Sequence, residues 1–180
     1  MGRLKTSPSG PTSVRTGAFA LRGEVGRPGT LTVADLRRGW EQHSADVVFE
    51  CASSGPRHHR FEGPLLREVV ADARPDFDVR RRRDRSRFLL AVTGGDGHHT
   101  VLSWGEIDPD FGDVPALLAT ALDGVALDLA GSQLVVPTDR CGARYISAIT
   151  SVWVGASLVP GPAPDLGLSS SAPGPGPGPE

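Results

Sequence analysis

The segment Phe88-Leu-Leu-Ala-Val-Thr93 decides the fold class. It is apolar on both faces, which is typical of a strand in the middle of a sheet. The cluster Gly94-Gly-Asp-Gly97 predicts a turn directly after it, and residues 99–103 predict a returning strand. We therefore expect a β-sheet with this strand near its centre.

The chain after this hairpin predicts one helical turn and further short strands. Ser103 is placed to cap a single turn over residues 104–107. Residues 116–122 predict a strand that enters a hairpin turn at Asp123-Gly124. Two more strands are expected, over 134–136 and 149–154.

The chain before Phe88 alternates strands with short helices. Thr32 is placed to cap a short helix, with Asp35 three residues later as its capping partner. Leu65, Leu66, Val69 and Val70 recur at helical spacing and predict a second helix over 65–71. The remaining predicted elements are strands over 19–25 and 46–51, a loop over 52–60 and Pro64 in the first turn of the second helix. This order, followed by several strands, indicates an α+β fold with a mixed β-sheet and short helices.

Composition and charge exclude several classes of protein. The formal net charge is −2, yet residues 80–87 alone carry +5, so the rest of the chain sums to −7. Nucleic-acid-binding domains usually have Lys and Arg over a whole face, which this pattern does not predict. No apolar run approaches the roughly 18 residues of a membrane span, and no apolar region follows the start as in a secretory signal. We expect a cytoplasmic protein that binds neither nucleic acid nor membranes.

One domain is expected, over residues 17–158. Residues 1–16 are predicted to be a disordered segment, and so is the Gly/Pro-rich tail over 159–180, which contains seven of the 16 prolines. Within the domain, residues 80–87 are expected to form a solvated loop that its own positive charge extends.

Four segments carry a resemblance to a known family. They are, in chain order, Val47-Val-Phe-Glu-Cys51; Phe61-Glu-Gly-Pro-Leu-Leu66; Ser103-Trp-Gly-Glu106 with Pro115–Ala119 and Asp123-Gly124; and Leu134-Val-Val-Pro137 with Gly142-Ala-Arg-Tyr-Ile146. Together they resemble the molybdopterin-binding domain of the sulfite-oxidase-like oxidoreductases, and they span most of residues 21–154.

The resemblance implies a molybdenum–molybdopterin cofactor and an enzyme that transfers an oxygen atom and two electrons. Cys51 would be the catalytic residue and the thiolate ligand of the metal, a soft ligand that suits this kind of ion. A small-molecule substrate and a separate electron-transfer partner would follow, because nothing in the sequence marks a haem or flavin domain.

The same resemblance assigns the cofactor-binding residues. Gly142, Ala143 and Arg144 would bind the cofactor phosphate, through backbone N–H groups and the guanidinium. His59 and His98 flank segments that resemble pocket loops, and would line the cofactor pocket.

A non-catalytic domain of the same fold, without molybdenum, is the alternative. Such a domain would bind a small ligand or a partner protein, and Cys51 would be an ordinary core thiol. Ser147 stands where the family has a lysine, and only residues 1–16 precede the first predicted strand, where fuller family members carry a pterin-binding segment. These departures favour the alternative, whereas Cys51 and the Gly-Ala-Arg motif favour the enzyme.

Overall fold

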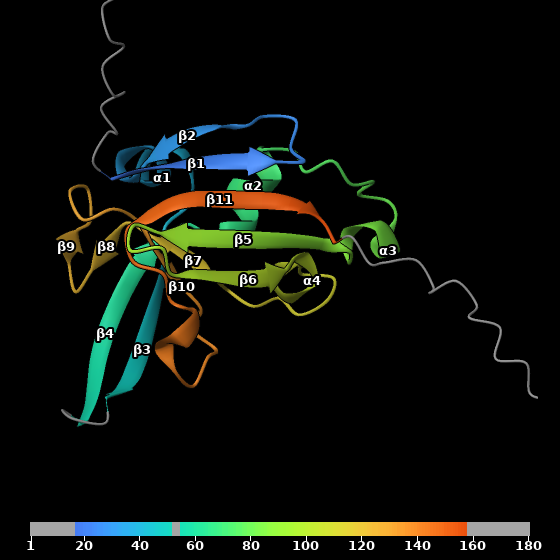
Figure 1. Cartoon of the computed structure of the whole chain (residues 1–180). Coiled ribbons are helices and arrows are strands. Elements are labelled where there is room, and N and C mark those ends of the chain that lie inside the picture. Colours follow the sequence, from blue (N-terminus) through green and yellow to red (C-terminus); the bar gives the residue numbers. More distant parts are fainter. Residues whose placement is uncertain (1–16, 52–54, 158–180) are drawn as a thin grey trace, which may run out of the picture.

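The computed structural model describes residues 17–51 and 55–157, whose strands form three sheets. The largest has five strands, and Figure 1 shows it across the middle of the molecule. The order of its strands is β2 (Gly29–Thr32), β1 (Ala18–Gly23), β11 (Ile149–Ala156), β5 (Phe88–Gly94) and β6 (His99–Ser103). β1 and β11 pair in parallel, and the other neighbours are antiparallel.

The strand predicted to lie mid-sheet is confirmed as β5, between β11 and β6. Its side chains alternate between buried and half-buried, and Phe88, Leu90 and Val92 are fully buried. The continuous apolar run therefore places only one face of the strand in the core.

A second sheet has four strands, in the order β3 (His43–Cys51), β4 (Gly55–Gly63), β8 (Ala121–Leu122) and β9 (Val125–Ala126). β3 and β4 pair along their whole length and form a hairpin that extends away from the other sheets in Figure 1. The expected loop over 52–60 is therefore wrong from Gly55 onward. The polar run Arg57-His58-His59-Arg60 concealed the strand, because most of its side chains face solvent and give no apolar alternation.

The third sheet pairs β7 (Leu117–Ala119) with β10 (Gln133–Val135). The expected strand over 116–122 is thus divided in two, because Thr120 leaves the β7 ladder and donates its N–H to the Glu62 carbonyl. The hairpin turn at Asp123-Gly124 is confirmed, with positive φ at both residues.

The predicted capping box at Thr32 is confirmed, and Ser103, predicted as a cap, also forms a capping box. α1 (Val33–Gly39) follows Thr32, whose Oγ1 accepts from the Asp35 N–H at 3.1 Å while the Asp35 carboxylate accepts from the Thr32 N–H. Ser103 and Glu106 make the same reciprocal pair at α4 (Trp104–Ile107). The second predicted helix is α2 (Leu66–Asp72). Its N-cap is Leu65, so Pro64 precedes the helix and its expected place in the first turn is wrong.

The arginine-rich segment corrects the expectation of an extended loop over 80–87. It contains a helical turn, α3 (Arg82–Arg85), and the Arg85 side chain is only 14% exposed because it pairs with Asp108 and Asp110. The segment itself carries mainly positive charges. The carboxylates that pair with Arg85 come from the loop after α4.

Two groups of buried side chains form the core. The larger includes Leu66 and Val69 of α2 packed with residues of the five-stranded sheet, and the smaller includes Phe61 at the base of the β3–β4 hairpin. Tyr145 packs against both groups. No helix in the described part of the chain is long and apolar enough to span a bilayer.

Candidate functional site

Gly142, Ala143 and Arg144 form a short 3-10 turn, η1 (Gly142–Arg144). The N–H groups that begin a helical turn have no partner within it. The backbone here therefore has the donors that the resemblance requires for a phosphate. Whether the charge around these donors suits a phosphate depends on the contacts of the Arg144 side chain.

Arg144 is held by two carboxylates, and we call Arg144, Asp139 and Glu106 the Arg144 triad. Its Nε and Nη2 donate to the two oxygens of Asp139 at 2.8 and 2.6 Å, and its Nη1 donates to Glu106 Oε2 at 2.8 Å. The hydrogen bonds to Asp139, and then those to Glu106, raise the pKa of the guanidinium above its usual value. Arg144 is therefore a fixed cation whose charge is already compensated.

This charge balance does not fit a phosphate ligand. One guanidinium and two carboxylates sum to −1, and the paired fork that would bind phosphate oxygens is occupied by Asp139. A phosphate at η1 would have to displace Asp139 or lie beside its negative charge. The structure therefore gives Arg144 a role in holding the 139–144 loop against α4, and its assignment to a cofactor phosphate stays a prediction.

His98 lies beside η1. Its Nε2 is 3.1 Å from the Ala143 carbonyl oxygen, so two of the residues assigned to the cofactor pocket are in contact. This contact uses one ring nitrogen to fix the turn.

His59 lies on β4 and is oriented by Asp123 in the β8–β9 turn. The two are joined by a 2.8 Å contact between Nδ1 and Oδ2, and Asp123 also accepts from the Arg60 N–H at 2.8 Å. The Arg60 hydrogen bond, and then His59, hold the pKa of Asp123 below its usual value. The ring centre of His59 is 6.4 Å from that of Phe61, and the ring centre of Phe61 is 6.4 Å from that of Tyr145. Because Tyr145 directly follows η1, neighbouring aromatic rings connect His59 to this turn.

Cys51 is the last residue of β3, and its backbone pairs with Gly55. His59 pairs with Val47 on the same hairpin, so the Cys51 backbone lies four residues, about 13 Å, farther along the strand. The Cys51 side chain lies outside what the structure describes, and its role as a metal ligand stays a prediction.

A cleft that the sequence did not reveal lies at the base of the same hairpin. We call it the β3 cleft, and its volume is about 390 Å³. It is lined by His43, Ser44, Ala45, Asp46, Leu65, Arg67, Pro115, Leu117 and Pro137. Leu65 and Leu117 are buried in the smaller core group and make its floor apolar. Its residues come from four distant parts of the chain. Only Leu65, Pro115, Leu117 and Pro137 fall in the segments that carry the family resemblance.

His43 supplies an unsatisfied polar atom at this cleft. Its Nε2 is shielded from solvent and has no hydrogen-bond partner among the described residues. The nearest carboxylate oxygen of Glu68 is 4.0 Å away, beyond hydrogen-bond distance. A buried polar atom without a partner is costly. Because Nε2 is shielded, a ligand in the cleft reaches it only when the His43 ring turns, and a hydrogen bond would then remove that cost.

The charges around the β3 cleft are nearly balanced and slightly acidic. Arg67 pairs with Asp113, and Arg60 lies 3.7 Å from Asp46 and donates to the Ser44 hydroxyl at 3.0 Å. Arg60 also lies 3.5 Å from Glu62, so with Glu68 included these two arginines are accompanied by four carboxylates. The cleft is therefore suited to a neutral or cationic molecule.

The ionisation of Tyr145, the single tyrosine of the chain, reports on the environment beside η1. Burial, and then the negative charge of Asp139, raise its pKa from 10.0 to about 12. We expect ultraviolet absorbance to show ionisation near pH 12 in the native protein and near pH 10 in concentrated urea. Because the folded pKa is the higher one, the contribution of Tyr145 to stability is complete below pH 10 and is lost as the pH rises toward 12. Ionisation near pH 10 with native circular dichroism would contradict this environment.

Comparisons with known proteins show the fold. No protein-family model matches the chain, and no curated protein sequence matches it. Among solved structures, the chain is similar to the sulfane dehydrogenase SoxCD from Paracoccus pantotrophus, with a TM-score of 0.58 and 18% sequence identity. The similarity covers 76% of this chain and 37% of that chain, so the chain spans little more than a third of the SoxCD chain. The two proteins share a mixed α+β fold over this region.

Proposed function

We propose that this chain is a ligand-binding domain of the sulfite-oxidase-like fold that works without a molybdenum centre and binds its ligand in the β3 cleft. The observation that carries the proposal is the Arg144 triad. The residue that the resemblance assigns to the cofactor phosphate already has two carboxylate partners. The fold shared with part of SoxCD supports the architecture.

The β3 cleft defines the class of ligand. Its volume of about 390 Å³ is near the lower end of ligand pockets, which run from roughly 300 to 1,000 Å³. The floor is apolar, the rim is slightly acidic, and His43 Nε2 needs a partner. A hydroxyl group donates and accepts, so it satisfies either tautomer of His43. The ligand is therefore a small aromatic or aliphatic molecule, neutral or cationic, that carries a hydroxyl or amino group.

Three probes with the same phenol ring test this class: tyramine (a cation), tyrosol (neutral) and 4-hydroxyphenylacetate (an anion). We expect tyramine and tyrosol to shift the amide resonances of residues 43–46 in the full chain, with the anion at least about fivefold weaker, because carboxylates outnumber the cations. His43→Phe keeps the ring but removes the nitrogens, and should weaken binding at least about fivefold. His99→Phe, at an exposed position on β6, is the matched control and should bind normally.

Equal binding of all three probes, or shifts centred on residues 142–144, would overturn this proposal. An equal loss in His43→Phe and His99→Phe would also count against it, because His99 does not line the cleft.

A molybdopterin-dependent oxidoreductase is the second candidate. Two observations favour it: Cys51 ends a strand, as the resemblance requires, and the fold is shared with a protein whose name is sulfane dehydrogenase. Cys51 would then hold the metal, with a small-molecule substrate and a separate electron-transfer protein. Nearly one molybdenum per chain after expression in a host that makes the cofactor, lost in Cys51→Ser, would establish this candidate and overturn the first.

A further inference from the structure

We propose that Arg80, Arg81, Arg82 and Arg83 form a docking surface for an acidic segment of a partner protein. We call these four residues the arginine platform. The proposal is independent of the β3 cleft, because none of these four arginines lines it.

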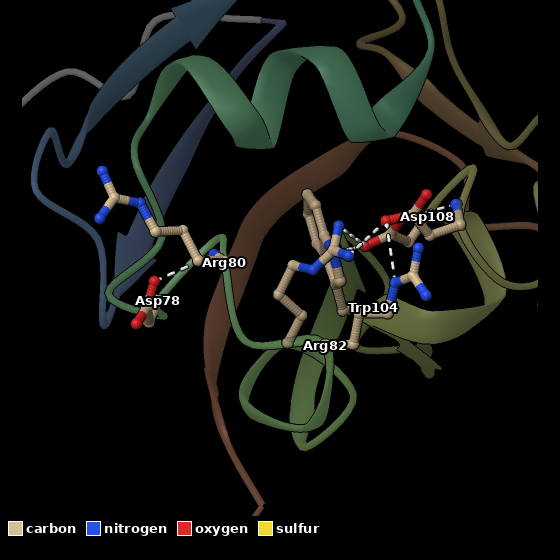
Figure 2. A network of polar contacts seen from close by, with 7 residues as sticks. Asp78, Arg80, Arg82, Trp104 and Asp108 are labelled. Atoms are coloured by element: carbon tan, nitrogen blue, oxygen red, sulfur yellow. Dashed lines mark hydrogen bonds and ion pairs between the residues drawn. The ribbon is translucent and has the colours of Figure 1, made fainter.

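The platform is held in place by a buried anchor. Arg85, the last residue of α3, donates to Asp108 at 2.8 Å, and Asp108 is 1% exposed. Trp104 also donates to Asp108, at 2.7 Å, and the Arg85 guanidinium lies 5.6 Å from the Phe111 ring centre. Figure 2 shows Trp104 and Asp108 side by side beneath α2. Arg85 therefore stabilises the fold, and it fixes the backbone that carries the four platform arginines.

The platform arginines are exposed and weakly held. The side chains of Arg81 and Arg82 are 80% and 73% exposed, and their nearest carboxylates are 3.5 and 3.7 Å away. Arg80 and Arg83 have no side-chain partner among the described residues, and Figure 2 shows Arg80 pointing away from the Asp108 network. Exposed pairs of this kind contribute little to stability, so a partner carboxylate can replace them readily.

The shape of the platform suits side chains of a protein partner. Arg81, Arg82 and Arg83, with Asp84, surround an open hollow of about 430 Å³. Asp84 accepts a hydrogen bond from Arg87 Nε at 2.8 Å. Its negative charge is therefore paired with Arg87, and the platform stays positive. Opposite charges across an interface speed association and select the partner.

Nucleic acid fits this surface less well than an acidic protein segment does. Recognition of single strands depends on aromatic side chains that stack on bases, and residues 78–87 contain none. The flanking Phe77 and Phe88 pack against each other, with ring centres 5.1 Å apart, and are not available for stacking.

The test measures binding of a fluorescein-labelled ten-residue glutamate peptide to the full chain by fluorescence anisotropy. We expect binding at about 50 mM NaCl that weakens strongly at about 300 mM, because exposed charges are screened. The variant R81E/R82E/R83E should bind at least tenfold more weakly. The control R22E/R38E/R57E has the same change of net charge at exposed positions elsewhere, and should lose less than threefold.

Three results would overturn the proposal. They are no binding of the peptide at low salt, equal losses in the two triple variants, and tighter binding of a labelled ten-nucleotide uridine RNA with the same dependence on the platform. Near-ultraviolet circular dichroism confirms that each variant is folded.

Discussion

Replacing Arg85 with alanine should lower the free energy of unfolding by about 3 kcal/mol, because it leaves the buried carboxylate of Asp108 without its counter-charge. The Trp104 side chain and the Asp110 N–H would still donate to Asp108, which keeps the loss at the lower end for a broken buried pair. Denaturant unfolding followed by tryptophan fluorescence measures the change, since Trp104 lies in the network.

Arg81→Ala is the control for this prediction. Its side chain is 80% exposed and its nearest carboxylate is 3.5 Å away, so the free energy of unfolding should change by less than about 0.5 kcal/mol. Equal losses for the two variants would show that Arg85 is not the anchor of the arginine platform.

Replacing Gly63 with alanine should destabilise the protein by about 3 kcal/mol or more. A Cβ at this position would fall on the carbonyl oxygen of Leu118 and within 2.8 Å of the Ala119 Cα, so β4 and β7 would have to separate. Overpacking against backbone costs more than overpacking against a side chain that can turn away. Thermal unfolding by circular dichroism measures the effect.

Gly39→Ala is the matched substitution at a site with space. No atom lies within 4 Å of its Cβ position, and Gly39 ends α1, so the midpoint of unfolding should stay the same or rise slightly. A similar loss at both glycines would contradict the close approach at Gly63. Since Gly63 belongs to a segment that carries the family resemblance, this part of the resemblance reflects packing.

The sequence predicted the elements whose signals are local. Thr32 and Ser103 predicted where two helices begin, and the apolar run from Phe88 predicted an internal strand. β4 was missed because its pairing with β3 depends on backbone hydrogen bonds, which polar side chains do not reveal. α3 was missed because its stabilising charges lie on Asp108 and Asp110.

The candidate site was less predictable than the fold. His98 contacts Ala143, but no signal in the sequence pointed to the carboxylate partners of Arg144. Asp139 lies only five residues away, yet nothing in the local pattern shows that its carboxylate faces the guanidinium. The β3 cleft is assembled from segments around residues 43, 65, 115 and 137, so it exists only once the chain has folded.

The position of β11 has a consequence for biosynthesis. This strand lies between β1 and β5 in the five-stranded sheet and pairs in parallel with β1, which a ribosome makes about 130 residues earlier. Until Ile149–Ala156 leaves the exit tunnel, β1 and β5 both present an unpaired edge to other nascent chains. Between the synthesis of β1 and the release of β11, these unpaired edges expose the nascent chain to aggregation.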